Sequence, residues 1–396
     1  MKLRSVRLGE VINDFNSLRK PIKSTDRVSG VYPYYGASGV VDHVDDYIFD
    51  GDYLLIAEDG ENLRSRSTPI AFLASGKFWV NNHAHVVRGN DLADTRYLNY
   101  LLATTDISGY LTGSAQPKLN KASMESILLS LPDLKTQQAI AEVLGALDDK
   151  IAANTRIAEN LNELFSAHWR ALDSSSESAL ITVESLLGEK IGGDWGTAES
   201  TESAPNEVYC IRGADITDLQ QAGLGKMPRR FLKTKSLERR KLKDGDLVVE
   251  LSGGSPTQST GRAVLVTDAL LNRLALPLTS SNFCRIVRPK DPELSFYLYG
   301  LLQTSWRRGE FFSFENGSTG IKNLAFADYC ADKAVSLPDN ESLKQFNQLA
   351  QSIFKLMHSL GAESSQLAAT RDALLPQLMS GKLRVRDAEE VVENVL

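Results

Sequence analysis

Gly113-Ser114, Lys118 and Leu131-Pro132-Asp133 stand in this order at the end of a β-rich segment and before a long segment of helical periodicity. The same residue types return in the same order further along the chain, at Gly317-Ser318, Lys322 and Leu337-Pro338-Asp339. The offset is 204 residues for the first two parts and 206 for the third. An ordered repeat of this kind predicts one structural unit that the chain uses twice.

The two halves also match inside their β-rich parts. Asp50-Gly51-Asp52 stands before the apolar run Tyr53–Ile56, as Asp244-Gly245-Asp246 stands before Leu247–Val249. Short apolar runs separated by Gly, Asp and Asn are typical of strands joined by turns. Chance does not supply such an ordered set, so two similar β-rich domains are predicted. Further pairs lie 200 residues apart: Asn82 and Asn282, Val87-Arg88 and Val287-Arg288, Tyr97-Leu98 and Tyr297-Leu298, and Leu101-Leu102 and Leu301-Leu302.

Each β-rich half is followed by a predicted long helix, which begins near residue 134 in the first half and near residue 340 in the second. Asp133 and Asp339 stand at the N-cap positions, each behind a proline that stops the preceding strand. Pro376 and Gly381 are expected to end the second helix. At 1.5 Å per residue, each helix spans roughly 55–60 Å.

Both helices carry a heptad pattern, which requires a partner helix, and the chain supplies two. Asn154 falls at a core position, where a buried amide fixes the register between helices at some cost in stability. The alternative is that the helices only brace one large domain. The residues predicted to form the helix seam are Ile140, Leu144, Leu147, Ile151, Leu161, Phe346, Ile353, Leu360, Leu367 and Leu374.

The chain has 396 residues, of which 42% are hydrophobic. This is enough to form two hydrophobic cores of ordinary size. A basic stretch with an apolar run behind it is absent at the N-terminus, and no 18-residue apolar segment occurs, so a cytoplasmic protein is expected. Cys210, Cys284 and Cys330 are far apart in sequence and form no Cys-x-x-Cys pair. We expect them to be reduced, buried thiols and not metal ligands.

The charge is unevenly distributed along the chain. A formal net charge of −6 and a pI near 5.6 at first argue against nucleic acid. However, nine Lys and Arg residues lie between Lys226 and Lys243, against Glu238 alone. Because local potential attracts a polyanion, the net value does not exclude DNA. The alternative is a solvated basic surface with no partner.

Several stretches then point to a known family: Tyr32–Gly39, Asp50–Ile56, Gly113–Asn120, Leu131-Pro132 with Gln137-Gln138, and Leu374–Leu383. Together with the two-unit layout, they make the chain resemble the DNA-specificity subunit of type I restriction–modification systems over essentially its whole length. The second half departs from the pattern at residues 320–323, where Gly-Ile-Lys-Asn replaces the Gln-Pro-Lys-Leu of residues 116–119. This departure leaves the base preference of that half open.

The resemblance implies an α+β protein with two similar β-rich target-recognition domains, separated by two long helices that pack as an antiparallel coiled coil. Each recognition domain would read one half of a bipartite, asymmetric DNA sequence, and the helices would set the spacer between the halves. The implied domains are residues 1–133 (target recognition 1), 134–175 (spacer helix 1), 176–339 (target recognition 2), 340–384 (spacer helix 2) and 385–396 (acidic tail).

The resemblance also implies partners and a division of labour. Two methyltransferase subunits would dock on the helices, bring S-adenosylmethionine and flip out an adenine for N6-methylation. Restriction and translocation subunits would add ATP and Mg chemistry, and the complex would serve phage defence. The chain itself lacks an Asn/Asp-Pro-Pro-Tyr loop, a strand-linked Gly-x-Gly-x-x-Gly and a Walker A loop, so no catalysis and no cofactor of its own are expected.

Two other functions remain open at this point. One is a coiled-coil scaffold that has no sequence-specific DNA binding. The other is a self-contained modification enzyme whose active site has degenerated. A gel shift with and without a methyltransferase partner separates the first from a DNA-recognition subunit, and bound S-adenosylmethionine in the isolated chain would favour the second.

DNA contacts are expected from polar and basic side chains on loops, because base edges are read by hydrogen bonds and phosphates by cations. The histidines at 83 and 85 alternate on a predicted strand and could be polar surface, DNA contacts or the beginning of a metal site. Arg64→Ala or Arg262→Ala is expected to weaken specific binding by about 1–3 kcal/mol if the side chain contacts a base. The candidates are Arg64, Ser65, Arg66, Lys77, Asn81, Asn82, His83, Gln116 and Lys118 in the first half, and Arg229, Arg230, Ser255, Gln258, Ser259, Thr260, Arg262, Lys322 and Asn323 in the second.

Overall fold

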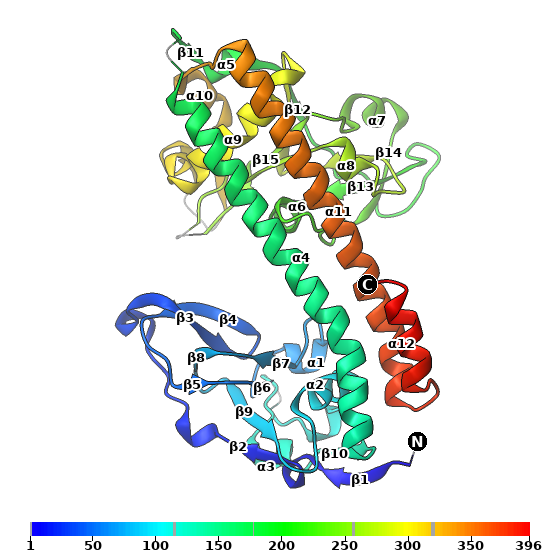
Figure 1. Ribbon diagram of the computed structural model, residues 1–396. Helices are drawn as coiled ribbons and strands as arrows, with labels where there is room; N and C mark the ends of the chain where they lie inside the picture. Colours follow the sequence, from blue (N-terminus) through cyan, green and yellow to red (C-terminus); the bar gives the residue numbers. More distant parts are fainter. Residues whose placement is uncertain (1, 114–115, 177, 256–257, 318–320) are drawn as a thin grey trace. The chain divides into compact units, whose positions relative to one another are not determined.

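The computed structural model describes residues 2–113, 116–176, 178–255, 258–317 and 321–396. It divides into two compact units (Figure 1), of which unit 1 is Met1–Lys150 with Leu367–Leu396 and unit 2 is Ile151–Gln366. Both long helices, α4 (Leu134–Ser174) and α11 (Asn340–Met379), pass from one unit to the other. Ser114, Ser318 and Gly320 of the repeated motifs lie outside the described residues.

Unit 1 is built on two four-stranded sheets. The first has the order β2 (Ile12–Asp14), β9 (Ala84–Gly89), β6 (Tyr53–Ala57) and β7 (Ala71–Ala74), with every pair antiparallel. The second has the order β4 (Gly39–Val44), β3 (Ser29–Gly36), β8 (Lys77–Val80) and β5 (Phe49–Asp50), with β3 and β8 parallel. The other elements include α1 (Asn62–Ser65), α2 (Thr95–Thr104), α3 (Lys121–Glu125) and the pair β1 (Arg4–Arg7) with β10 (Leu128–Leu131).

Unit 2 repeats this plan. Its first sheet has the order β12 (Leu187–Gly192), β19 (Cys284–Pro289), β15 (Leu247–Glu250) and β17 (Ala263–Leu265), again antiparallel throughout. Its second has β14 (Arg229–Leu232), β13 (Asn206–Ile211) and β18 (Leu278–Ser280), with β13 and β18 parallel. The other elements include α7 (Thr234–Arg240), α9 (Ser295–Arg307), α10 (Phe326–Asp332), the strands β16 (Ser252–Gly253), β21 (Lys322–Leu324) and β20 (Glu315–Asn316), and the pair β11 (Leu180–Thr182) with β22 (Ala334–Ser336). The predicted duplication of a β-rich domain is therefore confirmed.

The repeated Asp-Gly-Asp motif forms the turn that enters the central strand of each first sheet. Gly51 and Gly245 have φ of +120° and +83°, a region open mainly to glycine. The arginine of each Val-Arg pair closes the turn: the Arg88 Nε donates to the Asp52 carbonyl at 2.8 Å, and the Arg288 Nε donates to the Asp246 carboxylate at 2.9 Å. These sequence matches therefore belong to the scaffold.

The two long helices pack against each other in opposite directions. In unit 1 the Arg371 guanidinium contacts the Asp148 carboxylate at 2.6 Å. In unit 2 Phe165 packs against Phe354 and Phe346, with ring centroids 5.4 and 5.5 Å apart. As the residue number of the contact increases along α4, the number of its partner on α11 decreases. The two helices are therefore antiparallel. Of the predicted seam, Ile140, Leu144, Leu147, Phe346, Ile353, Leu367 and Leu374 are buried, and Ile151, Leu161 and Leu360 are half-buried.

Asn154 lies inside the helix pair of unit 2 and is 1% exposed. Its Nδ2 donates to Glu363 Oε2 at 2.7 Å and to Ser364 Oγ at 3.3 Å, while its Oδ1 has no hydrogen-bond partner in the described part of the chain. An amide that finds its partners at only one alignment of two helices favours that alignment.

The N-caps and the C-terminal region differ in how well they follow the sequence prediction. Asp133 and Asp339 accept from the backbone N–H groups of Thr136 and Ser342 at 3.0 and 2.9 Å, as expected of N-caps. Pro376, however, does not end the second helix. It lies exposed in the last turn, where its missing N–H removes one helical hydrogen bond. The helix ends at Met379, before Gly381 at φ +69°.

The segment predicted as an acidic tail is instead a helix, α12 (Val385–Glu393). Ala388 and Val392 are buried, and Val385 is half-buried at the same helical spacing. Only Ser380–Arg384 separate α12 from α11, so α12 folds back beside the end of that helix in unit 1 (Figure 1). Within the described residues no helix is both long and apolar enough to cross a bilayer.

His358 on α11 gives unit 2 a pH-dependent stability. Burial, with the nearby Arg273 guanidinium, lowers the pKa of His358 from 6.5 to about 4. Because the unfolded chain binds this proton more readily, stability is fully present above pH 6.5 and falls as the pH drops toward 4. We expect unit 2 to lose about 2 kcal/mol between pH 7.5 and pH 5 through this group.

Urea titrations at the two pH values, followed by tryptophan fluorescence, measure this loss. In His358→Gln the difference between the two pH values should shrink by that amount. His168→Gln, which changes an exposed histidine on α4, serves as the control and should keep the wild-type difference. An unchanged pH dependence in His358→Gln would contradict the assignment.

Candidate nucleic-acid interface

Three loop segments of unit 1 are joined by backbone hydrogen bonds at one end of the first sheet. The Glu58 N–H, directly after β6, donates to the His83 carbonyl at 2.9 Å, directly before β9. The Leu119 N–H donates to the Glu58 carbonyl at 2.8 Å, which brings in the loop that contains Gln116 and Lys118. We call this three-segment arrangement the loop frame.

Unit 2 contains the same loop frame. The Leu251 N–H donates to the Phe283 carbonyl at 2.8 Å, and the Leu324 N–H donates to the Leu251 carbonyl at 2.8 Å. Leu251, Phe283 and Leu324 therefore correspond to Glu58, His83 and Leu119. The two units share this backbone pattern although the side chains at its positions differ.

The loop frame corrects one alignment made from sequence. The backbone of Lys118 forms a β-bridge with Asp59 in unit 1, as Asn323 pairs with Ser252 between two strands of unit 2. Lys118 thus corresponds to Asn323 and not to Lys322. The Lys322 ammonium is held by the Glu315 carboxylate at 2.8 Å and lies over the Phe312 ring.

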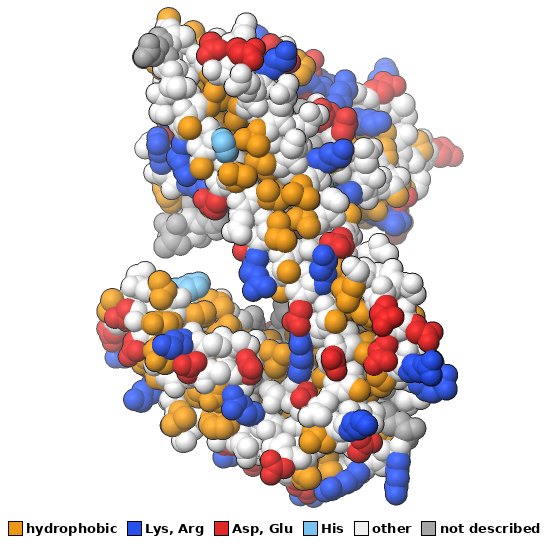
Figure 2. Space-filling view, viewed as in Figure 1, with side chains coloured by type: hydrophobic (Ala, Val, Ile, Leu, Met, Phe, Trp, Pro, Cys, Tyr) orange, Lys and Arg blue, Asp and Glu red, His pale blue; other side chains and the backbone are white. Residues whose placement is uncertain are grey.

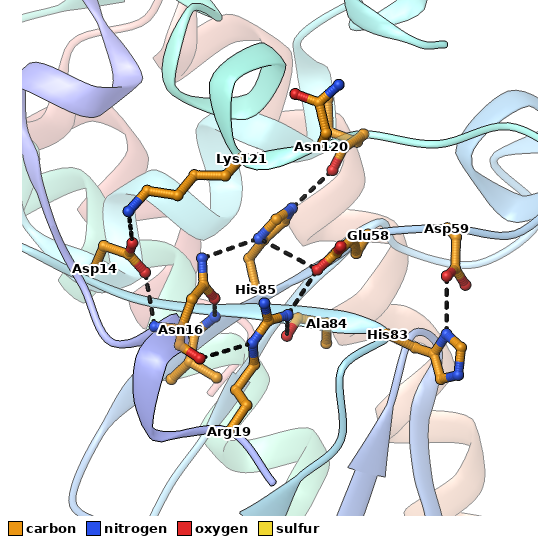
Figure 3. A network of polar contacts seen from close by, with 12 residues as sticks. Asp14, Asn16, Arg19, Glu58, Asp59, His83, Ala84, His85, Asn120 and Lys121 are labelled. Atoms are coloured by element: carbon orange, nitrogen blue, oxygen red, sulfur yellow. Dashed lines mark hydrogen bonds and ion pairs between the residues drawn. The ribbon is translucent and has the colours of Figure 1, made fainter. Parts of the chain in front are cut away.

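A buried polar network lies under the loop frame of unit 1 (Figure 3). His85 is 1% exposed, and its Nε2 donates to the Leu119 carbonyl at 2.7 Å. The Nδ1 atom accepts from the Asn16 amide at 3.1 Å. Arg19 Nη1 contacts both Glu58 Oε2 at 2.7 Å and the Ala84 carbonyl at 2.8 Å. The network ties the backbone of all three frame segments together.

The environment of His85 keeps its ring neutral. Burial lowers the pKa of His85 below 6.5, and the Arg19 charge acts in the same direction, against the hydrogen bond to Leu119 and the Glu58 carboxylate. A neutral ring with hydrogen on Nε2 satisfies both contacts. His85 is therefore a structural clamp, which the sequence left undecided. Within the described residues no group of three or more His, Cys, Asp or Glu side chains could hold a metal ion.

Six of the nine predicted contacts in the first half lie together and face solvent at this loop frame. Arg64 Nη2 donates to the Gly113 carbonyl at 2.8 Å, which joins the α1 turn to the loop before Gln116. The His83 Nδ1 lies 2.8 Å from Asp59 Oδ2 (Figure 3). The six exposed residues are Arg64, Ser65, Asn82, His83, Gln116 and Lys118.

The other three have different surroundings, which do not favour DNA contact. Arg66 is in the left-handed conformation at φ +50°, and its guanidinium donates to the carbonyls that end α2, including Leu102 at 3.2 Å. Asn81 is buried, and its Oδ1 accepts from the His83 N–H at 2.8 Å. Lys77 lies at the opposite end of β8, over the Tyr47 ring at 4.4 Å.

Three neighbouring candidates of the second half, Ser259, Thr260 and Arg262, are buried or half-buried. Arg262 forms a two-point ion pair with Glu250, at 2.7 and 2.9 Å, and Glu250 is 2% exposed. Thr260 is fully buried and donates through its N–H and hydroxyl to Glu315 Oε1, and Ser259 is 3% exposed. The Thr260 and Arg262 side chains thus stabilise the loop from within.

The remaining assignments of the second half fall in two groups. Gln258 and Asn323 are exposed and Ser255 is half-buried near the loop frame. Arg229 is exposed on β14, and the Arg230 guanidinium stacks on the Trp195 ring at 3.9 Å. The basic run Lys226–Lys243 comprises β14, α7 and their flanks.

The sequence did not single out three residues that the structure places at the loop frames. Asp59 orients His83, Phe283 takes the position of His83 in unit 2, and Arg285 takes the position of His85. Arg285 is half-buried in β19, and its side chain makes no hydrogen bond or ion pair in the part of the chain that the structure describes. A signal was present, because the match of Asn82 with Asn282 already aligns His83 with Phe283 and His85 with Arg285.

Comparison with known proteins agrees with this architecture. Residues 2–163 match the type I restriction modification DNA specificity domain. A Haemophilus influenzae chain assigned as a type I restriction enzyme specificity subunit is 43% identical over 141 residues, which are 35% of this chain and 36% of that relative. The specificity subunit of the type I restriction enzyme MjaIX of Methanocaldococcus jannaschii is 25% identical over 359 residues, 84% of this chain and 80% of the relative.

A solved structure shows the same fold. The S subunit of a type I restriction–modification system from M. genitalium matches with a TM-score of 0.54 at 13% identity, over 96% of each chain. The two β-rich units and the antiparallel helices are thus similar to those of a solved S subunit. The match of residues 2–163 and the relatives named above make the chain similar to type I restriction–modification specificity subunits.

Proposed function

We propose that this chain is the non-catalytic subunit that reads a bipartite, asymmetric DNA target for a type I restriction–modification complex. The observation that carries the proposal is the loop frame, which occurs in both units with different exposed side chains. His83 and Lys118 stand in unit 1 where Phe283 and Asn323 stand in unit 2. Since base edges are distinguished by donors, acceptors and methyl groups, two such frames read two different half-sites.

Cations on both units supply the binding that does not depend on sequence. Arg64 and Lys118 are exposed in unit 1, and the basic run Lys226–Lys243 is the largest concentration of positive charge in unit 2. Contacts of this kind release counterions from DNA and make binding salt-dependent. They support DNA binding by a chain whose formal net charge is −6.

The recognition domains are residues 1–133 and 176–339, and the helices between them set the spacer and dock two adenine-N6 methyltransferase subunits. An apolar stripe on α4 in unit 2 supports the docking role. Ile157 and Leu164 are 43% and 42% exposed, with half-buried Leu161 between them at helical spacing, and Leu356 on α11 is 47% exposed. Figure 2 shows hydrophobic side chains over these helices of unit 2.

The chemistry of the complex belongs to its other subunits. The methyltransferase subunits bring S-adenosylmethionine, and restriction and translocation subunits bring ATP and Mg. What this chain contributes is placement: it decides which adenines come within reach of an active site. The adenine itself must leave the base stack for methylation.

Charging the apolar stripe is expected to release the methyltransferase subunit. Ile157→Glu with Leu164→Glu should weaken the complex by at least about 2 kcal/mol, roughly 30-fold, because the buried centre of an interface does not accept unpaired charge. Titration of the two purified subunits in an ultracentrifuge measures this. Folding should be unaffected, since both side chains already face water.

Arg170→Glu on α4 is the matched control. This residue is exposed and lies on a different face of the helix. It should bind the methyltransferase subunit as the wild type does. Equal binding by the double variant would place the docking surface elsewhere.

Single-molecule methylation sequencing tests the proposed function directly. DNA is taken from cells that carry this chain together with the methyltransferase subunit encoded beside it. One bipartite motif with N6-methyladenine in each half is the expected result. A stable complex without methylation, and without a gel shift on any DNA, would instead support a coiled-coil scaffold.

A further inference from the structure

The two loop frames differ most clearly at the residue that precedes β9 in unit 1 and β19 in unit 2. In unit 1 this residue is His83, whose side chain is 51% exposed, and in unit 2 it is Phe283, which is 53% exposed. Their carbonyls accept the same hydrogen bond, from Glu58 and from Leu251. The backbone therefore holds the two side chains at equivalent places.

Asp59 determines what His83 can offer to a ligand. A carboxylate only accepts hydrogen bonds, so the 2.8 Å contact to Asp59 Oδ2 places a hydrogen on Nδ1. In this tautomer of a neutral imidazole Nε2 is the acceptor, and it makes no hydrogen bond to any described residue. In the major groove an acceptor pairs with an exocyclic amino group, N6 of adenine or N4 of cytosine.

Phe283 offers a different chemistry at the same place. Ser252 stands where Asp59 stands in unit 1, and its hydroxyl is engaged by Asn323. A single exposed phenylalanine is ordinary on a protein surface. Here its position in the loop frame singles it out, and an apolar ring in the major groove recognises the methyl group of thymine.

We infer that His83, oriented by Asp59, and Phe283 are specificity-determining side chains at equivalent positions of the two half-sites. His83 selects a base with an exocyclic amino group in one half, and Phe283 selects thymine in the other. The inference rests on the proposed function. It names the residues that distinguish the two half-sites and the kind of base that each residue selects.

Selection from a random duplex DNA library tests the inference. The full chain, in complex with its methyltransferase subunit, is used as wild type, His83→Phe, His83→Gln and Phe283→Ala, and the bound DNA is sequenced. His83→Phe should change one position of one half from adenine or cytosine to thymine. His83→Gln, which keeps an acceptor, should retain the amino-bearing base. Phe283→Ala should lower the thymine preference at one position of the other half by about 5- to 150-fold.

Matched controls lie on the same units. His43→Phe changes another exposed histidine of unit 1, and Leu180→Ala removes an exposed apolar side chain, 71% accessible, from unit 2. Both should select the wild-type motif. Thermal unfolding followed by circular dichroism should be the same for all variants, because each changed side chain is exposed.

The outcomes separate the inference from the proposed function. If the wild type selects a bipartite motif and His83→Phe and Phe283→Ala select the same motif, the inference is overturned and the function stands. Equal weakening on every sequence also overturns it, because the side chains would then contact phosphate. If the wild type selects no motif, the proposed function fails and the inference falls with it.

Discussion

Replacing Arg262 with alanine is expected to lower the free energy of unfolding of unit 2 by about 3–5 kcal/mol. The Arg262 guanidinium makes two hydrogen bonds to the Glu250 carboxylate, whose side chain is 3% exposed. Without the arginine, a buried charge is left with no counter-charge. Urea unfolding followed by the fluorescence of Trp169, Trp195 and Trp306, three of the four tryptophans, measures the loss in this unit.

Two further variants identify the cause of this loss. Arg239→Ala removes an exposed arginine from α7 and should change stability by less than about 0.5 kcal/mol. Arg262→Met combined with Glu250→Leu removes both charges and should recover most of the stability, because a buried ion pair can be replaced by apolar side chains of similar volume. Weakened DNA binding with unchanged stability in Arg262→Ala would restore the assignment made from sequence, a base contact.

Exchanging residues 1–133 for those of another family member is expected to replace one half of the recognised DNA sequence and leave the other unchanged. Each mismatched base pair costs about 1–3 kcal/mol and the costs add, so the original half-site should no longer be methylated. The exchanged segment must keep Arg96 and Tyr100, because these residues contact Asp149 and Asp148 on α4. Methylation sequencing gives the new motif.

The reciprocal exchange is the control for this experiment. Replacing residues 176–339 should alter only the other half of the motif. A change in both halves from either exchange would mean that the units do not read DNA independently. Loss of all methylation with a folded chain would point to broken contacts at α4, which restoring Arg96 and Tyr100 should repair.

The parts of the fold that were predictable from sequence depend on local patterns. The Asp133 and Asp339 caps bond within three residues, and the apolar spacing of each helix is fixed by its own turns. The Asp-Gly-Asp turns were visible for the same reason. The α12 helix is also predictable, since Val385, Ala388 and Val392 have helical spacing, although its acidic residues favour a tail.

The site was less predictable, because burial of a polar side chain depends on distant partners. Thr260 is buried and hydrogen-bonded to Glu315, 55 residues away, and Arg262 is half-buried in an ion pair with Glu250. From sequence, both looked like polar residues of an exposed loop. Position in the loop frame had the same problem: a shift of one residue made Lys322 look like the counterpart of Lys118.

The hydrogen bonds that define the loop frame run from backbone to backbone, at Glu58, His83 and Leu119 and again at Leu251, Phe283 and Leu324. An amide or a carbonyl is the same whatever side chain the residue carries. Substitutions at the outward-facing positions can therefore accumulate across generations without loss of folding. With the proposed function, such substitutions would let the two half-sites vary separately on an unchanged backbone.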